Sequence, residues 1–310
     1  MDWSHFGMTP RGFRPSVDTT SYFPAATHEA ALAGIATAFA RRDGLVLIDG
    51  PPGVGKSLVS RVWLDKLPDA VPRVVLPNAS ATRPADLLQA ILFDLSQPYQ
   101  GLGEQELRLA VTAQLLALTG SGKPLVLVID EAQNLSREAL EELRLLGNID
   151  TRDGPAAFTL LVAQPTLRDA FRRPAYESIA QRVGATFTIE SLSAEESVAY
   201  LRHQVKAAGG DPAAVFDDSA LSLLAGACGG SPRVLNRAAA LALDLAAQGE
   251  ADAVDVEAAM ECLSRLGLDE PAEPDQPEGE PAPALPPTGK MRQPPAGRTP
   301  KLKATRKRSA

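Results

Sequence analysis

One short stretch constrains this chain more than any other feature of its sequence. It reads Gly50-Pro51-Pro52-Gly53-Val54-Gly55-Lys56-Ser57 and fits the pattern of a phosphate-binding loop, G-x-x-x-x-G-K-[ST]. It follows an apolar run and precedes a predicted helix, so the N–H groups that open this helix would point at bound phosphate. We expect all eight residues to bind a nucleotide, with Lys56 on the β- and γ-phosphates and the Ser57 hydroxyl on Mg²⁺. The alternative is a glycine-rich turn without a ligand.

Short apolar runs alternate with helical patterns over the first part of the chain, which is typical of a parallel sheet with crossover helices. The predicted strands are Leu45–Ile48, Val74–Leu76, Leu125–Ile129, Phe158–Val162 and Thr186–Ile189. The strands stop after Leu192, where a capping box at Ser193–Glu196 predicts a helix that runs to Val205. Further helices are predicted over 219–227, 232–247 and 254–263. We therefore predict an α/β core with an N-terminal strap over residues 1–191 and a helical domain over 192–268.

The third predicted strand ends in two acids, Asp130 and Glu131. Such a pair is by itself more often a helix N-cap followed by a first-turn acid. However, open parallel sheets bind ligands at the carboxyl ends of their strands, where the phosphate loop also lies. We therefore expect Asp130 to hold Mg²⁺ together with Ser57, and Glu131 to polarise the water that attacks the nucleotide. The two motifs together predict a hydrolase of ATP.

Composition excludes several other classes of protein. The net charge of −7 argues against a chain that coats nucleic acid through bulk charge. The two cysteines, Cys228 and Cys262, lie far apart and have no zinc-site spacing. The sequence shows no signal peptide and no apolar stretch long enough to span a membrane, so we expect a cytoplasmic protein.

The composition changes after Leu268. Residues 269–310 contain ten of the 26 prolines and few large apolar residues, which predicts a disordered tail. Its first part is acidic, and its last part carries eight basic residues and no acid: Lys290, Arg292, Arg298, Lys301, Lys303, Arg306, Lys307 and Arg308. This basic end could contact DNA phosphates, or it could simply be a solvated terminus.

Further segments resemble the AAA+ superfamily, and within it the ExeA-like (general secretion pathway protein A-like) ATPases, over about residues 1–266. They are Asp130–Leu135, Glu141–Leu146, Val162–Pro165, Ala180–Arg182 and Gly230–Arg237, together with an N-terminal entry segment. The resemblance implies a P-loop parallel sheet of order 5-1-4-3-2, a C-terminal helical lid, and ATP bound where subunits of a ring or filament meet. In the entry segment, Phe6, Phe13 and Phe23 either line an adenine pocket or bury the strap on the sheet.

The same resemblance implies three further catalytic residues. Gln164 corresponds to sensor 1 and would orient the attacking water. Arg182 corresponds to an arginine finger that acts on the neighbouring subunit, with Arg172 and Arg173 as alternatives. Arg233 corresponds to sensor 2. It opens a predicted helix, where a cation is disfavoured unless an anion is near, so the sequence favours contact with the γ-phosphate.

Three functions remain open from the sequence. The first is an ATPase that forms a homo-oligomer and drives assembly or remodelling of an unknown protein client. Secretion-type ExeA proteins carry a membrane span and a peptidoglycan-binding domain after the ATPase, and this sequence has neither, so a role in placing a secretion channel would need them from another protein. The second is a DNA-targeting ATPase similar to the MuB- and TniB-type helpers of transposition. The third is a scaffold that holds nucleotide without hydrolysing it.

Overall fold

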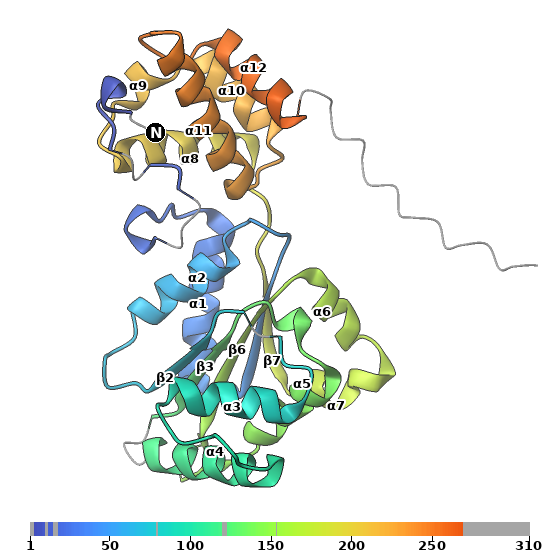
Figure 1. Cartoon of the computed structure of the whole chain (residues 1–310). Helices are drawn as coiled ribbons and strands as arrows, with labels where there is room; N and C mark the ends of the chain where they lie inside the picture. Colours follow the sequence, from blue (N-terminus) through green and yellow to red (C-terminus); the bar gives the residue numbers. More distant parts are fainter. Residues whose placement is uncertain are drawn as a thin grey trace, which may run out of the picture. The chain divides into compact units, whose positions relative to one another are not determined.

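The computed structural model describes residues 3–9, 12–14, 18–78, 80–119, 123–152 and 154–268. Its main sheet is parallel, with the strands β1 (Leu45–Asp49), β2 (Arg73–Leu76), β3 (Leu125–Ile129), β6 (Ala157–Ala163) and β7 (Val183–Thr188) (Figure 1). The strands lie side by side in the order β2-β3-β6-β1-β7. Numbered one to five along the chain, this order is 2-3-4-1-5, which is the predicted order read from the opposite edge. The predicted fold is confirmed.

The fifth strand departs most from its predicted bounds. It begins at Val183 instead of Thr186, and Ile189 lies just beyond its end. Its residues alternate between half-buried and exposed, because β7 is an edge strand, whereas β1, β3 and β6 are buried throughout. An alternating edge strand has no continuous apolar run, and such a run was the signal that located the other strands.

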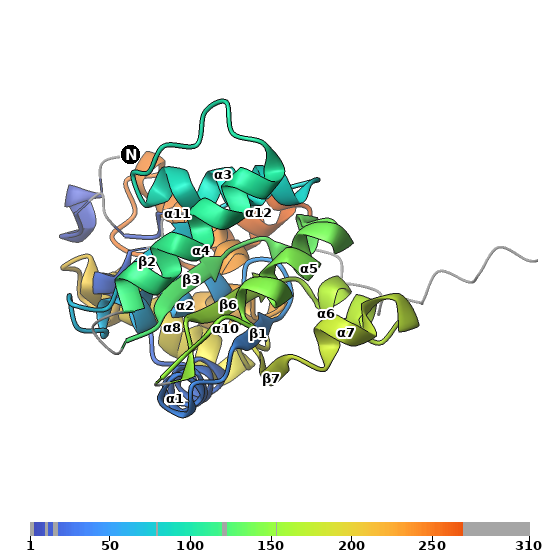
Figure 2. The ribbon, with the colours of Figure 1, turned by 90° about the horizontal axis from the view of Figure 1, so that it is seen from below.

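Helices cover both faces of the sheet. They are α1 (Ala26–Arg41), α2 (Lys56–Asp65), α3 (Pro84–Asp94), α4 (Glu104–Leu118), α5 (Arg137–Leu146), α6 (Pro165–Phe171) and α7 (Glu177–Ala180). Figure 2 shows α1 on one side of the sheet and α3 and α4 on the other. Short 3₁₀ turns add η1 (Ser4–Phe6), η2 (Thr19–Ser21), η4 (Ala132–Asn134) and η5 (Pro174–Tyr176).

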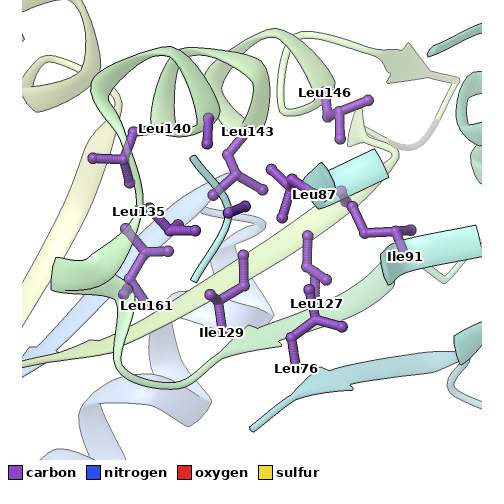
Figure 3. Packing of buried hydrophobic residues seen from close by; sticks show 14 of the residues in the cluster. Leu76, Leu87, Ile91, Leu127, Ile129, Leu135, Leu140, Leu143, Leu146 and Leu161 are labelled. Carbon is purple, nitrogen blue, oxygen red and sulfur yellow. The ribbon is translucent and has the colours of Figure 1, made fainter. Parts of the chain in front are cut away.

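Two apolar cores follow from this layering. Successive residues of a strand point to opposite faces, so a strand buried on both faces feeds both cores. In β3, Val126 and Val128 pack with the cluster that contains Ile35 of α1 and Trp63 of α2. The other residues of β3 pack with α3 and α5 in a second apolar cluster (Figure 3). The residues of this cluster that are drawn there include Leu76, Leu87, Ile91, Leu127, Ile129, Leu140, Leu143, Leu146 and Leu161.

An ion pair attaches α4 to α5. The Arg108 guanidinium donates to both carboxylate oxygens of Glu142, at 2.8 Å each, and Glu142 is buried. This two-pronged contact with Glu142 raises the pKa of Arg108. After α5, β4 (Asp150–Thr151) and β5 (Gly154–Pro155) form a small antiparallel pair. Strands of two residues are too short to leave a periodic signal in the sequence.

The C-terminal helices of the described chain share a core with its first residues. The helices are α8 (Ala194–Ala207), α9 (Pro212–Val215), α10 (Asp218–Ala227), α11 (Pro232–Gln248) and α12 (Val256–Leu266). Trp3, Phe6 and Phe13 are buried among them, and the Trp3 indole N–H donates to Asp244 of α11 at 2.9 Å. Phe6 and Phe13 therefore pack on these helices and not on the sheet. The ring of Phe23 contacts those of Tyr200 and His203 on α8.

Within the described ranges, no helix has both the length and the hydrophobicity that crossing a membrane requires. The tail over residues 269–310, with its predicted disorder and DNA contact, lies outside the described residues.

Candidate nucleotide site

The phosphate loop joins the carboxyl end of β1 to α2, which begins at Lys56. Three of its glycines have backbone conformations that L residues rarely adopt, with φ of +157° at Gly50, +83° at Gly53 and +103° at Gly55. A Cβ atom on Gly53 would lie 2.9 Å from the Cβ of Arg233, and one on Gly55 would lie 3.0 Å from Cε1 of His28. The loop is thus packed between α1 and the start of α11, and larger residues would displace it.

The Lys56 ammonium lies inside the loop. Its Nζ donates to the carbonyl oxygens of Gly50 at 2.8 Å and Pro51 at 2.7 Å. Burial lowers the pKa of Lys56, and the nearby carboxylates of Glu131 and Asp130 oppose this shift. An ammonium has three donors. Because the two carbonyls use only two of them, Lys56 keeps a donor for a phosphate oxygen.

Asp130 follows the last residue of β3 and faces the start of α2. Burial raises the pKa of Asp130, while hydrogen bonds from the Ser57 hydroxyl and from the backbone N–H of Glu131, the latter at 2.9 Å, act in the opposite direction. A carboxylate and a hydroxyl in contact are hard oxygen ligands of the kind Mg²⁺ prefers, and a cation would stabilise the ionised form of this buried acid. The pair therefore fits the predicted magnesium site.

Glu131 has a left-handed backbone, with φ 55° and ψ 36°, which is uncommon for a residue with a side chain. Its Oε2 accepts a hydrogen bond of 2.5 Å from Nε2 of Gln133. Oε1 of Gln133 accepts a bond of 3.0 Å from the backbone N–H of Gln164. Gln133 was not among the predicted site residues. The sequence signal that could have indicated it is its place in the turn directly after the acidic pair.

Gln164 caps the start of α6, directly after β6. Because β6 lies between β1 and β3, Gln164 stands at the same edge of the sheet as the phosphate loop and Asp130. Its backbone N–H is held by Gln133, and its side-chain amide makes no hydrogen bond to the described part of the chain. The amide is therefore available to a ligand or water.

Arg233 lies in the first turn of α11 and reaches the phosphate loop of its own chain. Its backbone N–H donates to the carbonyl oxygen of Gly53 at 3.2 Å. Its guanidinium is close enough to lower the pKa of Lys56 by charge repulsion. Two cations beside one loop favour binding of an anion there.

Arg182 lies far from this site. It precedes β7, and the parallel register places Val183 beside Leu45 and Thr188 beside Asp49. Arg182 is therefore at the amino edge of the sheet, six residues along β1 from the start of the phosphate loop at Gly50, which is roughly 20 Å at about 3.3 Å per residue. Its side chain is exposed and has no hydrogen-bond or ion-pair partner among the described residues.

The two alternative arginines lie on the same side of the core. Arg172 and Arg173 follow α6 and are both exposed. Arg172 lies 3.4 Å from a carboxylate oxygen of Asp169. They line an open hollow together with Glu177 of α7 and Gln181, which directly follows this helix. Within the described residues, none of the three candidate arginines contacts the nucleotide site of its own chain.

His28 supports the phosphate loop from α1, a role that the sequence did not indicate. Its Nε2 lies 2.9 Å from the carbonyl oxygen of Val54, and the ring stacks on Tyr22 with centroids 6.1 Å apart. Burial lowers the pKa of His28, which favours the neutral imidazole. One histidine in an alanine-rich helix carries no pattern that distinguishes this role from ordinary packing.

Asp49, the last residue of β1, is fully buried and anchors two neighbouring elements. The Thr188 hydroxyl donates to its Oδ1 at 2.6 Å, and Nη1 of Arg168 lies 2.9 Å from its Oδ2. These two contacts attach α6 and β7 to Asp49, which directly precedes the phosphate loop.

Comparisons with known proteins agree with this geometry. Residues 40–171 match the family described as AAA domain, a range that includes Lys56, Asp130 and Gln164. The chain is 34% identical over 232 residues to General secretion pathway protein A of Aeromonas hydrophila. That alignment covers 74% of this chain and 42% of the relative, so the chain spans less than half of the relative's length.

Solved structures support the fold. The ORC2 protein of Aeropyrum pernix, in ADPNP–ADP complexes, has a TM-score of 0.66 at 18% identity, over 82% of this chain and 71% of that one. Cdc6p of Pyrobaculum aerophilum has a TM-score of 0.64 at 15% identity, over 86% and 71% of the two chains. The RuvB Holliday junction branch migration motor of Thermotoga maritima has 0.54 at 16%, over 80% and 74%. Residues 40–171 are therefore a domain of the AAA family, in a chain that is similar to general secretion pathway protein A.

Proposed function

We propose that this chain binds ATP with Mg²⁺ at the edge of the sheet and hydrolyses it to ADP and phosphate. The observation that carries the proposal is the convergence of Lys56, Ser57, Asp130 and Glu131 there. The two carboxylates act on the pKa of Lys56, and the Ser57 hydroxyl bonds Asp130. Phosphoryl transfer to water requires a cation for the phosphates, oxygen ligands for a metal ion, and a carboxylate that accepts a proton from water. Lys56, the Ser57–Asp130 pair and Glu131 are groups of these three kinds.

In the proposed mechanism, Lys56 and the loop N–H groups hold the β- and γ-phosphates. Ser57 and Asp130 would hold Mg²⁺, and the ion would offset the charge of the phosphates. Glu131 accepts a proton from a water whose oxygen attacks the γ-phosphorus, and the bond from this phosphorus to the β-phosphate oxygen breaks as ADP leaves. Gln164, with its free amide at this edge, orients the water, and Arg233 contacts the γ-phosphate from the same chain.

The proposal includes assembly of subunits, with Arg182 supplied to a neighbouring site. Its support is geometric, because Arg182 is exposed at the amino edge of the sheet and cannot reach the loop of its own chain. Nucleotide would then be bound between subunits of a ring or filament. Such an assembly would act on a protein client, in line with the secretion protein to which the chain is similar.

Arg182→Ala is expected to remove turnover and to leave nucleotide binding by the monomer unchanged. An arginine finger contributes about 10³–10⁵ in rate, and its loss does not touch the loop of the same chain. Phosphate release and titration with a fluorescent ATP analogue measure the two properties separately. Arg172→Ala and Arg173→Ala are matched controls, expected to keep parental turnover.

A mixing experiment tests whether the arginine acts between subunits. Arg182→Ala has an intact site and Lys56→Ala an intact arginine, so equal amounts of the two should recover measurable turnover that neither has alone. Parental turnover by Arg182→Ala itself would assign the finger to another residue, and Arg172 and Arg173 would be the next tested. Absence of recovery in the mixture would argue against action between subunits.

The second candidate function is ATP-dependent targeting of DNA. It is favoured by one sequence observation, the run of eight basic and no acidic residues over 290–308. We expect duplex DNA to raise phosphate release at low salt, and this stimulation to fall steeply as salt rises, because contacts with DNA phosphates release counterions. Turnover that is the same with and without DNA at low salt would exclude this function.

A further inference from the structure

Gln133 uses both ends of its side chain. Its amide nitrogen donates to Oε2 of Glu131 at 2.5 Å, and its amide oxygen accepts from the backbone N–H of Gln164 at 3.0 Å. The first bond stays within the turn after β3, whereas the second crosses to the end of β6. The Glu131 carboxylate is thereby connected to a neighbouring strand and not only to its own backbone.

The anchor at Gln164 is rigid. This N–H belongs to the residue that caps α6, and β6 is buried between β1 and β3. One helical turn further, Arg168 forms the ion pair with the buried Asp49 that attaches α6 to β1. Gln133 therefore bonds to a backbone position that is fixed from both sides.

The chemistry of the contact suits a general base. A carboxamide is neutral, so it holds the carboxylate without pairing it with an opposite charge, as Arg or Lys would do. Only one oxygen of Glu131 is engaged, because no hydrogen bond to Oε1 occurs within the described residues. One oxygen is thus held in place while the other remains available to accept from water.

We propose that Gln133 is a positioning residue for ATP hydrolysis, which holds the Glu131 carboxylate by tying it to the start of α6. The inference rests on the proposed function, because the position of Glu131 affects turnover only if this residue acts on the attacking water. Gln133 is suited to the task because it combines a donor and an acceptor in one side chain. Its two hydrogen bonds go to Glu131 and to the backbone of Gln164, both of which the proposed mechanism places at the attacking water, so its loss acts on the chemical step and not on nucleotide affinity.

Gln133→Ala is expected to lower kcat by about 10–100-fold, since a small misplacement of a catalytic group can cost about 100-fold in rate. The dissociation constant for a fluorescent ATP analogue should stay within about twofold, because the side-chain hydrogen bonds of Gln133 within the described residues go to Glu131 and Gln164 and not to the phosphate loop. Asn134→Ala is the matched control. It removes the same kind of group from the same turn, but the Asn134 side chain is exposed and without a hydrogen bond among the described residues.

Gln133→Glu separates positioning from a purely structural role. The glutamate keeps an acceptor for the Gln164 N–H but cannot donate to Glu131. A positioning role predicts that its kcat is as low as that of Gln133→Ala, whereas a role in holding only the β6–α6 turn predicts parental kcat. Parental kcat in Gln133→Glu would overturn the inference.

A double-mutant cycle completes the test. If Gln133 acts through Glu131, then Gln133→Ala should cost little further rate in a Glu131→Gln background, whereas independent effects would multiply. Multiplying effects would overturn the inference. The parent chain is assayed alongside, so that failure of the proposed function can be told from failure of this inference. A parent that releases no phosphate contradicts the proposed function. An active parent with a fully active Gln133→Ala variant contradicts only the role of Gln133.

Discussion

Lys56→Ala is expected to abolish nucleotide binding. The lysine is buried in the loop, and its ammonium is the charged donor closest to where phosphate would lie. A hydrogen bond to a charged group is worth up to about 3 kcal/mol, so losing the contact of the remaining donor with a phosphate oxygen should weaken binding by about 100-fold. The measurement is a titration with a fluorescent ATP analogue in the presence of Mg²⁺, and turnover should disappear with binding.

The control for this variant lies at the other end of the same helix. Lys66 is the exposed C-cap residue of α2, and Lys66→Ala should bind nucleotide as the parent does. The fold of Lys56→Ala should survive, because alanine removes a buried charge whose burial is unfavourable. A melting temperature close to the parent's would establish this. Parental affinity in a folded Lys56→Ala protein would contradict the placement of the phosphates in the loop.

Glu131→Gln is expected to bind nucleotide and to lose turnover. The amide keeps the size of the side chain but cannot accept the proton of the attacking water, and general-base catalysis contributes about 10²–10⁴ in rate. Because Lys56, Ser57 and Asp130 are untouched, affinity for the ATP analogue should be unchanged or higher. Phosphate release under saturating nucleotide measures the loss.

The matched control is Glu138→Gln in the first turn of α5, an exposed glutamate whose partner is Arg137. It removes the same charge from the region after β3, so a general electrostatic effect would appear in both variants. Equal phosphate release by the parent and Glu131→Gln would reject the mechanism. Absence of turnover in both, with binding intact, would instead support a scaffold that holds nucleotide without hydrolysing it.

Much of the fold and part of the site could be predicted because their signals are local. A buried parallel strand is a continuous apolar run, and four of the five strands were located closely in this way. The phosphate loop is a contiguous motif, and Asp130 and Glu131 follow a strand whose place at the ligand edge is a general property of parallel sheets. The role of Arg233 was predicted because a cation at the start of a helix is unfavourable without a nearby anion, and its backbone lies against Gly53 of the loop.

The remaining features depend on contacts between residues far apart in the chain. The Trp3 indole bonds Asp244 across 241 positions, and Arg168 meets Asp49 across the sheet. No local pattern encodes such pairs, because each partner alone is an ordinary core or surface residue. The edge position of β7 belongs here as well, since its alternating burial follows from having only one neighbouring strand.

The local motifs predict the chemistry that we propose for this protein: a loop for phosphate, oxygen ligands for a metal and an acid for water. How these groups are held in place follows from the tertiary structure. It brought Gln133 between Glu131 and Gln164, placed His28 under Val54, and put Arg182 at the opposite edge of the sheet. The physical reason is that backbone motifs follow from neighbouring residues, whereas the position of a side chain in a site follows from which strands and helices pack together.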